Sequence, residues 1–236
     1  MAVQANLTDS HLTSTVVNAP TAGGAISITT WMTATWSTSA TVKSLVGIYG
    51  PSAAAPITAI QIGSRITDNA VYVWTYGGGV LINTTSGVVN DGQLHFIAYT
   101  TDGTTHRLYV DGVLQATSTT GQIAGQFNTF YINGFPPGGT LETSTHVVES
   151  VRMYDRELAP AEITAMYVSR GARHNITFGL IAYYEFDEGA QGAGVNTCFD
   201  MSGTTPPANL TWIGTGSIMT YSHSTGESKT RPPVVN

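Results

Sequence analysis

Cysteine and basic residues are scarce in this 236-residue chain, and their scarcity excludes several functions. The single cysteine, Cys198, cannot form an intramolecular disulfide, so the core and the hydrogen bonds must stabilise the fold. Nine Lys and Arg residues stand against fifteen Asp and Glu residues, which gives a net charge of -6. Phosphate binding needs clustered Lys and Arg, and these nine are scattered. The sequence therefore argues against nucleic acid as a partner.

Long apolar runs and a targeting segment are also missing. No stretch approaches the roughly 20 apolar residues of a membrane-spanning helix, so we expect no membrane partner. The N-terminus carries neither a basic patch nor an apolar run, which predicts a protein that the ordinary secretory route does not export. Charged residues make up 10% of the chain, whereas Thr, Ser and Gly are abundant. This composition is typical of β-rich surfaces in assemblies and sugar-binding proteins.

The clearest structural signal lies between Asn90 and Thr117, where three Asp-Gly pairs separate two alternating apolar runs. The pair Asp111-Gly112 supplies the positive φ angles that a two-residue hairpin turn needs. On the strand before this turn, Leu108 shares one face with Val110, which is the period-2 pattern of a half-buried strand. The stretch predicts a β-meander with one face against a core.

Short strands with turn residues between them predict an antiparallel sandwich. Pro160 to Val168 is the one expected helix, with Pro in its first turn and Glu162 near the positive end of its dipole. A polar arm or lone edge strand (residues 1–24) and a polar tail (residues 222–236) flank the sandwich (residues 25–221). Gly189–Asn209 and Asn133–Ser144 read as loops, the second as a candidate contact element. Other strands are expected at Ala25–Trp36, Ser44–Tyr49, Ile57–Arg65, Ala70–Tyr76, Val80–Asn83, Phe127–Ile132, His146–Tyr154, Leu180–Phe186 and within Leu210–Tyr221.

The meander also carries a family resemblance, which extends over roughly residues 25 to 215. Its Asp-Gly and Leu-Tyr-Val-Asp-Gly motifs resemble the central hairpins of laminin-G-like, concanavalin A-like jelly rolls. Ile26–Trp31 is similar to an early strand of that family, and Val148–Ile163 is similar to its closing segment. Leu94 departs from the family's usual Trp, and Gly179–Gly189 resembles a strand that the family usually places first. The resemblance implies an all-β jelly-roll sandwich of two antiparallel sheets with one short helix.

Catalysis is the first function to weigh, because related jelly rolls include retaining glycosidases with Glu, Asp and Glu at alternate strand positions. Only Glu185 and Asp187 approach this pattern. The next residue on the same face, Gly189, has no carboxylate, so the nucleophile and acid pair is incomplete. We expect no catalytic residue and a chain that is not an enzyme, with glycosidase as the weaker alternative.

Cofactors and metals have little support in the sequence. Some members of the fold class hold Ca²⁺ at a sandwich rim, for which Asp187, Glu188 and Asp200 are the nearest candidates. No D-x-D-x-D-G ladder accompanies them, so we expect surface or turn carboxylates rather than ligands. The six histidines lack the H-x-x-x-H and H-E-x-x-H spacings of zinc sites, and His95 reads as structural. We therefore expect no metal and no cofactor, with a structural Ca²⁺ as the alternative.

Aromatic side chains are the remaining candidates for ligand contact, because sugars commonly stack on exposed Trp and Tyr rings. Trp74 and Tyr76 lie two positions apart and so share one strand face, while Phe135 lies in a Pro- and Gly-rich loop. These three residues form the predicted ligand-binding set. Core packing is the alternative for them, and it is the expected role of Trp31.

The combined reading is a non-enzymatic structural or binding protein. A charge-poor chain without a signal, and with ends able to dock, favours a virion component of a tailed bacteriophage, made in the host cytoplasm. It would decorate the capsid or belong to a fibre or tail, with the major capsid protein and further copies of itself as partners. The alternative is a carbohydrate-binding lectin module, which the family resemblance alone supports.

Overall fold

Asp-Gly turns fold the middle of the chain into the predicted meander. The strands β8 (Leu94–Thr101), β9 (His106–Val110) and β10 (Val113–Ser118) pair in sequence order. At the β9–β10 turn, Asp111 and Gly112 have φ angles of 51° and 76°. At the β8–β9 turn, the Asp102 carboxylate accepts the N–H groups of Thr104 and Thr105, both at 2.8 Å. The turn residues therefore fix the register of these strands.

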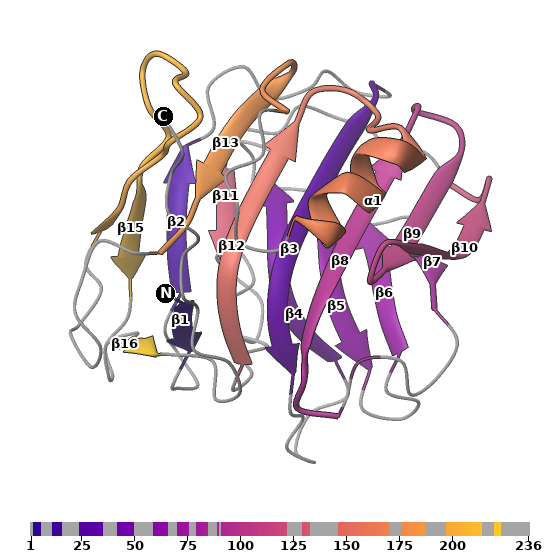
Figure 1. The fold of residues 1–236 in the computed structure, drawn as a ribbon, viewed down its shortest axis with the longest axis horizontal. Coiled ribbons are helices and arrows are strands. Elements are labelled where there is room, and N and C mark those ends of the chain that lie inside the picture. Colours follow the sequence, from indigo (N-terminus) through magenta and orange to yellow (C-terminus); the bar gives the residue numbers. More distant parts are fainter. Residues whose placement is uncertain are drawn as a thin grey trace.

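The computed structural model describes residues 2–5, 11–15, 24–34, 42–49, 59–65, 70–75, 79–84, 89, 91–121, 129–132, 146–169, 176–186, 197–213 and 220–222. These residues form two antiparallel sheets of eight strands each, which face one another in Figure 1. Sheet A runs β10, β9, β8, β3 (Ile26–Ala34), β12 (His146–Tyr154), β1 (Ala2–Ala5) and β16 (Thr220–Ser222), with β13 (Leu180–Tyr184) also paired to β12. Sheet B runs β14 (Thr197–Cys198), β15 (Leu210–Ile213), β2 (His11–Thr15), β11 (Thr129–Ile132), β4 (Val42–Tyr49), β5 (Ala59–Arg65), β6 (Ala70–Thr75) and β7 (Gly79–Asn83).

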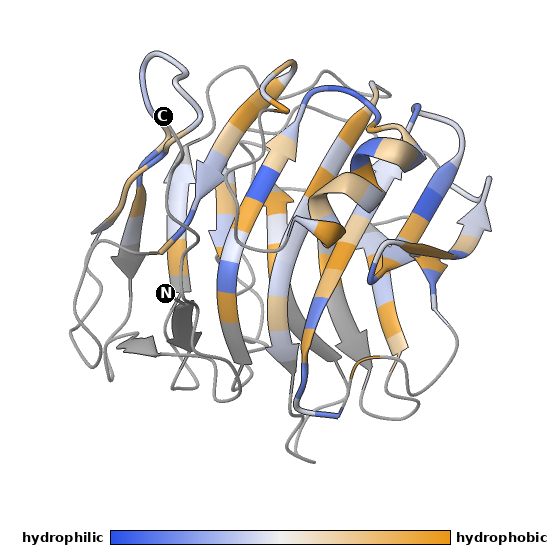
Figure 2. Ribbon diagram, viewed as in Figure 1, coloured by the Kyte–Doolittle hydropathy of each residue, from blue (hydrophilic) through white to orange (hydrophobic). Residues whose placement is uncertain are grey.

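The main core lies between the two sheets. Apolar residues alternate along the strands (Figure 2), which places one face of each sheet against the other. Ile28 and Tyr99 of sheet A are fully buried, as are Ile48 and Phe130 of sheet B. Burial of each such side chain stabilises the fold by roughly 1.5–3 kcal/mol. The predicted all-β sandwich of two antiparallel sheets is confirmed, with one helix among the described residues.

Helix α1 (Pro160–Val168) begins and ends where the sequence predicts and lies across the outer face of sheet A (Figure 1). At its start, Glu162 Oε2 accepts the N–H of Ala159 at 2.8 Å. Arg156 donates to both Glu162 oxygens, at 2.8 and 2.6 Å, so the first turn is held by a bidentate ion pair. The helix covers a second apolar cluster of buried residues, namely Trp31, Phe96, Ala98, Tyr109, Tyr154, Leu158, Ile163 and Met166.

The N-terminal residues differ from the predicted arm or lone edge strand. β1 lies between β12 and β16, and β2 lies between β15 and β11, so residues 1–24 contribute a strand to each sheet. Both strands are short, with the sequences AVQA and HLTST, and pair with distant parts of the chain, so their local pattern did not reveal them. The two-residue strand β14 likewise interrupts the predicted loop Gly189–Asn209. The loop Asn133–Ser144 and residues 223–236 lie outside the described residues, and the domain boundaries stay predictions.

The close approach of α1 to the β9–β10 turn gives the first testable prediction. A Cβ added at Gly112 would lie 3.0 Å from Tyr167 Cδ1, whereas one at Gly203, which also has a positive φ, would meet nothing within 4 Å. We expect Gly203→Ala to cost about 1 kcal/mol for its backbone conformation alone. Gly112→Ala should cost roughly 1–3 kcal/mol more, because it also overpacks the helix contact. Urea unfolding measures both losses, and equal losses would contradict this account.

Candidate functional site

The predicted aromatic set is only partly within the described residues. Trp74 is half-buried on β6, and its neighbours Val71 and Val73 are buried in the main core, which places Trp74 on the opposite face by strand alternation. Tyr76 and Phe135 lie outside the described residues. The structure therefore does not show whether the three come together, and ligand binding by this set stays a prediction.

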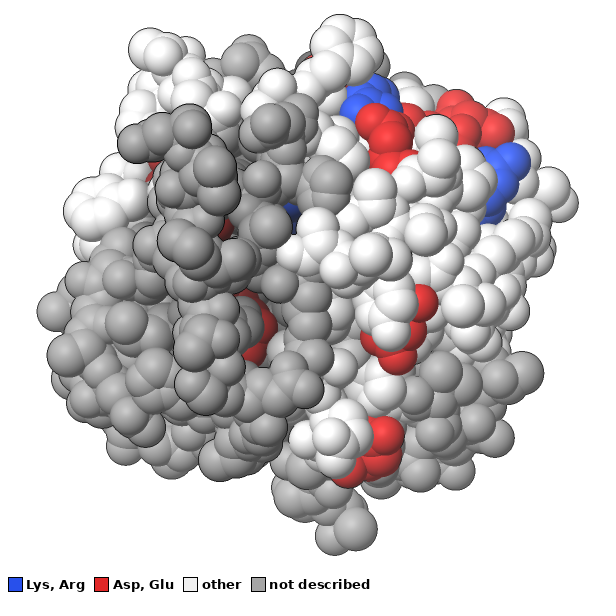
Figure 3. Space-filling view, in the orientation of Figure 1, with Lys and Arg blue, Asp and Glu red and all other residues white. Residues whose placement is uncertain are grey.

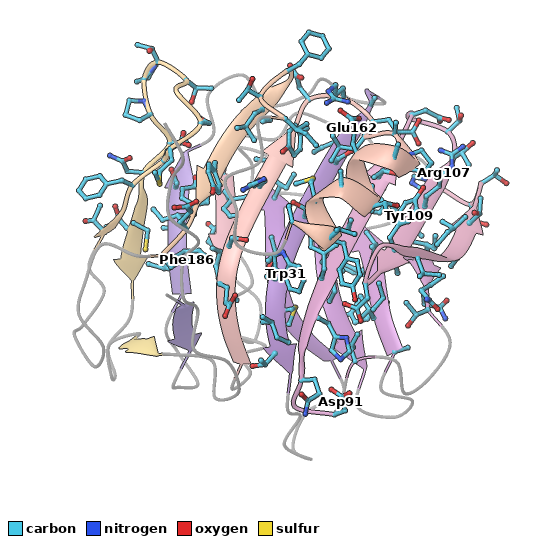
Figure 4. The ribbon with its side chains drawn as sticks, viewed as in Figure 1. Trp31, Asp91, Arg107, Tyr109, Glu162 and Phe186 are labelled. Carbon is cyan, nitrogen blue, oxygen red and sulfur yellow. The ribbon has the colours of Figure 1, made fainter. Side chains whose placement is uncertain are left out.

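A different set of side chains surrounds a groove of about 270 Å³ on the outer face of sheet A. We call it the α1 groove, because the last turn of α1 forms one wall and strands β3 and β8 form its base. Figure 4 shows Trp31 beside the helix. Ligand pockets for drug-sized molecules begin at roughly 300 Å³, so this volume suits a single small ring. The lining residues are Trp31, Leu94, Asp111, Tyr167 and Val168.

Two stacked aromatic rings form the apolar part of the α1 groove. The rings of Trp31 and Tyr167 have centroids 5.8 Å apart and an interplanar angle of 17°. Phe96 packs behind Trp31, with 5.2 Å between ring centroids. Trp31 is only 8% exposed, so the more accessible surface comes from the half-buried Tyr167 and from Val168, which is 73% exposed at the rim.

Asp111 supplies the polar part of the α1 groove. Its Oδ1 accepts the backbone N–H of Phe96 at 2.9 Å, and its Oδ2 lies 2.8 Å from His95 Nδ1. The backbone N–H of Asp111 donates to the Phe96 carbonyl at 2.8 Å. Its side chain is 32% exposed, and a carboxylate has about four acceptor positions. Asp111 can therefore accept further hydrogen bonds from a ligand without losing those that hold it.

His95 lies between two carboxylates. Its Nε2 lies 3.0 Å from Asp91 Oδ1, opposite the Asp111 contact, and its side chain is 12% exposed. The hydrogen bond to Asp111 raises the pKa of His95, burial opposes that shift, and the bond to Asp91 adds to it. Burial would raise the pKa of Asp91, but the Gln93 N–H and His95 together lower it. The two carboxylate contacts thus favour the protonated form of the His95 imidazole.

The carboxylates singled out for catalysis and calcium have other contacts. The Tyr183 hydroxyl donates to Glu185, and Arg152 donates to that hydroxyl at 3.0 Å. Burial raises the pKa of Tyr183 to about 12, so its phenol stays protonated at neutral pH. Asp200 accepts four hydrogen bonds, from Tyr183 N, Ser202 N, Thr204 Oγ1 and Ala208 N.

Metal binding is not decided by these contacts. The hydrogen bonds of Asp200 organise residues 200–208, while Asp187 and Glu188 lie outside the described residues. Within the described ranges, no three His, Cys, Asp or Glu side chains gather as a metal site requires. A structural Ca²⁺ stays an untested alternative.

Among the described residues, no helix has the length and apolarity needed to cross a membrane.

A second groove, of about 360 Å³, lies beside the segment of residues 200–208. The described residues that line it are polar or small and include no aromatic ring, so they offer hydrogen bonds but no stacking surface. The α1 groove combines both kinds of contact in one place, which makes it the better candidate. The second groove is lined by Thr13, Ser14, Pro207, Asn209 and Thr211.

Sequence reasoning assigned the α1-groove residues to other roles. Trp31 was expected in the core, Asp111 in a turn and His95 in a structural position, and all three do have those roles. Tyr167 and Val168 were expected only as helical residues. One sequence signal could have indicated the cluster around His95. Asp91 lies four positions before His95, and Asp111 directly follows the next strand, β9, which pairs with the strand that contains His95.

The family model described as the concanavalin A-like lectin/glucanases superfamily matches residues 6–164. None of the curated proteins matches the chain. A candidate carbohydrate-binding protein from Bacteroides ovatus shares the fold, with a TM-score of 0.62 and 14% identity over 92% of this chain and 60% of that one. The botulinum neurotoxin serotype G binding domain matches 69% of this chain and 41% of its own, with a TM-score of 0.53 and 12% identity.

Sialidases are also among the matches, and they correct one prediction. A Trypanosoma rangeli sialidase mutant with trans-sialidase activity matches 63% of this chain, with a TM-score of 0.51 and 18% identity. The prediction that the chain is not an enzyme is therefore wrong as a conclusion from its fold, because the same fold occurs within enzymes. This chain spans 23% of the sialidase's length, and identity this low shows the fold alone.

The position of His95 between two carboxylates predicts a pH-dependent stability. Its folded-state pKa is raised above the ordinary 6.5, so its stabilisation is complete below that value and is lost as pH rises through the folded pKa. We expect His95→Gln to lower the free energy of unfolding by roughly 1–3 kcal/mol at about pH 5.5. The difference from the native protein should shrink at about pH 9. Urea titrations at both pH values measure it, and a difference that does not change with pH would contradict the assignment.

Proposed function

Because this chain belongs to the concanavalin A-like lectin/glucanase superfamily, we propose that it is a carbohydrate-binding module that holds one sugar ring in the α1 groove. The observation that carries the proposal is the position of the stacked Trp31 and Tyr167 rings beside the partly exposed Asp111 carboxylate. A pyranose has an apolar face that packs on an aromatic ring and hydroxyls around its rim that donate to a carboxylate.

Preorganisation supports the α1 groove as a binding site. Asp111 is held by Phe96 and His95 before any ligand arrives, and Tyr167 is held against Trp31. Fixed side chains lose little conformational freedom on binding, which improves affinity for a small ligand. The Bacteroides ovatus neighbour, whose description concerns carbohydrate binding, supports the same class of ligand.

Tyr167 provides the direct test of sugar stacking. Tyr167→Ala removes the accessible ring and should weaken glycan binding by about tenfold or more, which corresponds to roughly 1.4 kcal/mol. Tyr167→Phe is the matched control, because it keeps the ring and should bind within about threefold of the native protein. A glycan array identifies the sugar, and calorimetry on the hit measures the affinities.

The folded state of both variants is checked by circular dichroism before binding is compared. Equal glycan binding by the native protein and Tyr167→Ala would place the sugar elsewhere, for which the predicted set Trp74, Tyr76 and Phe135 is the alternative. Absence of binding to any glycan would overturn the proposed function.

A finer proposal concerns where the module works. We propose that it is a virion component of a tailed bacteriophage, on the capsid or in a fibre or tail, with the major capsid protein and further copies of this chain as partners. The low charge content supports this placement, since only 10% of residues are Asp, Glu, Lys or Arg. Strand β10 supports self-association, because it ends sheet A and its sequence VLQATS contains no charge or proline to block a further strand.

Strand β10 also gives the test of assembly. Val113 is 60% exposed there, so Val113→Lys adds a charge to the edge without disturbing the core. Light scattering should report a species larger than 24.9 kDa for the native protein and a smaller one for Val113→Lys. Thr164→Lys, on the exposed face of α1, should associate like the native protein. A 24.9 kDa species alone at micromolar concentration, together with absence of the chain from purified virions, would overturn this placement.

A further inference from the structure

The electrostatics of the α1 groove favour one sign of ligand charge. Among the described residues that line it, Asp111 is the only one with an ionisable carboxylate, amine or guanidinium group. His95 and Asp91 stand behind Asp111, so this cluster contains two carboxylates and only one imidazole, and its acidic groups outnumber its basic group. An anionic ligand would therefore meet a like charge in a partly dehydrated groove.

The end of α1 adds negative potential from a second source. Tyr167 and Val168 belong to the last turn of the helix, whose terminal carbonyl groups carry the negative end of the helix dipole. The last turn contains no basic residue that would offset it. A cation near this end of a helix is stabilised, and an anion is destabilised.

The described arginines nearest to the helix and meander are committed to other carboxylates. Arg156 pairs with Glu162 at the opposite end of α1, and Arg107 pairs with Glu157 and lies 3.7 Å from Asp102. Figure 3 shows the most visible basic side chains beside acidic ones, and Figure 4 places Arg107 and Asp91 far apart on the viewed face. Neither arginine lines the α1 groove.

From these observations we infer that the α1 groove selects a sugar unit that carries a free ammonium group, such as a 2-amino hexose. Neutral hexoses bind more weakly, and sugars that carry a carboxylate, such as sialic acid, are rejected. The ammonium group forms a charge-assisted hydrogen bond with Asp111, while the ring packs on Tyr167. The inference rests on the proposed function, since it names the ligand class of the same groove.

The experiment compares glucosamine, glucose and N-acetylneuraminic acid by tryptophan fluorescence titration at about pH 6, where the amine is protonated, and low ionic strength. Native protein should bind glucosamine about tenfold more tightly than glucose, with no saturable binding of N-acetylneuraminic acid. Asp111→Asn keeps an oxygen acceptor and a residue type that tolerates a positive φ, and it should weaken glucosamine binding about tenfold. The same change in a distant turn, Asp102→Asn, should leave all three affinities unchanged.

A positive charge introduced at the rim makes the test specific for electrostatics. Val168→Lys and Val168→Gln add side chains of similar length, and the exposed position of Val168 tolerates both. We expect Val168→Lys to reduce glucosamine binding several-fold relative to Val168→Gln and to allow binding of N-acetylneuraminic acid. Both differences should shrink in about 0.5 M salt, because salt screens charges at the surface.

The outcomes separate the inference from the proposed function. Equal binding of glucose and glucosamine, with no effect of Asp111→Asn, would overturn the amino-sugar selectivity and leave carbohydrate binding intact. Tighter binding of N-acetylneuraminic acid than of glucosamine would also overturn it and would direct attention to Arg170, which follows α1 in the sequence. Failure of every glycan on the array and of all three sugars would overturn the proposed function itself.

Discussion

The carboxylate of Asp111 is the contact on which the outer face of sheet A depends. Its residue occupies the left-handed conformation of the β9–β10 turn, and its two oxygens reach back to the Phe96 N–H and to His95 on β8. One side chain therefore sets the turn, fixes its distance from the neighbouring strand and holds the imidazole. Each of its two oxygens makes one of these contacts, and the side chain, which lines the α1 groove, stays 32% exposed.

The other wall of the α1 groove depends on how the helix is anchored. Ser27 on β3 accepts the N–H of Leu158 at 2.9 Å and donates to the Arg156 carbonyl at 2.8 Å, which ties the entry of the helix to sheet A. The Arg156–Glu162 pair then holds the first turn. At the far end, the absence of a side chain at Gly112 lets Tyr167 approach the turn. The width of the groove thus follows from contacts at both ends of a nine-residue helix.

Local chemistry explains which features could be predicted from the sequence. Pro160 and Glu162 mark the start of α1, and the Asp-Gly pairs mark the turns, because these preferences act within a few residues. The alternation along β3 separates Trp31 from the main core but does not reveal that Tyr167, far away in the sequence, stacks on it. The pairing of β1 with β12 and β16, and of β2 with β11 and β15, is similarly non-local. Long-range packing therefore created the candidate site, and no short motif encoded it.

A fold shared with sialidases, a neurotoxin binding domain and a candidate carbohydrate-binding protein cannot by itself specify a ligand. The differences must come from the few side chains that each sandwich exposes at its outer faces. In this chain charged residues are rare, and Arg107 and Arg156 are matched with carboxylates away from the α1 groove. Among the described residues that line the α1 groove, Asp111 therefore has no competing charged side chain, and the negative end of α1 reinforces it. Under the inferred selectivity, this one carboxylate among the described residues decides the sign of the ligand.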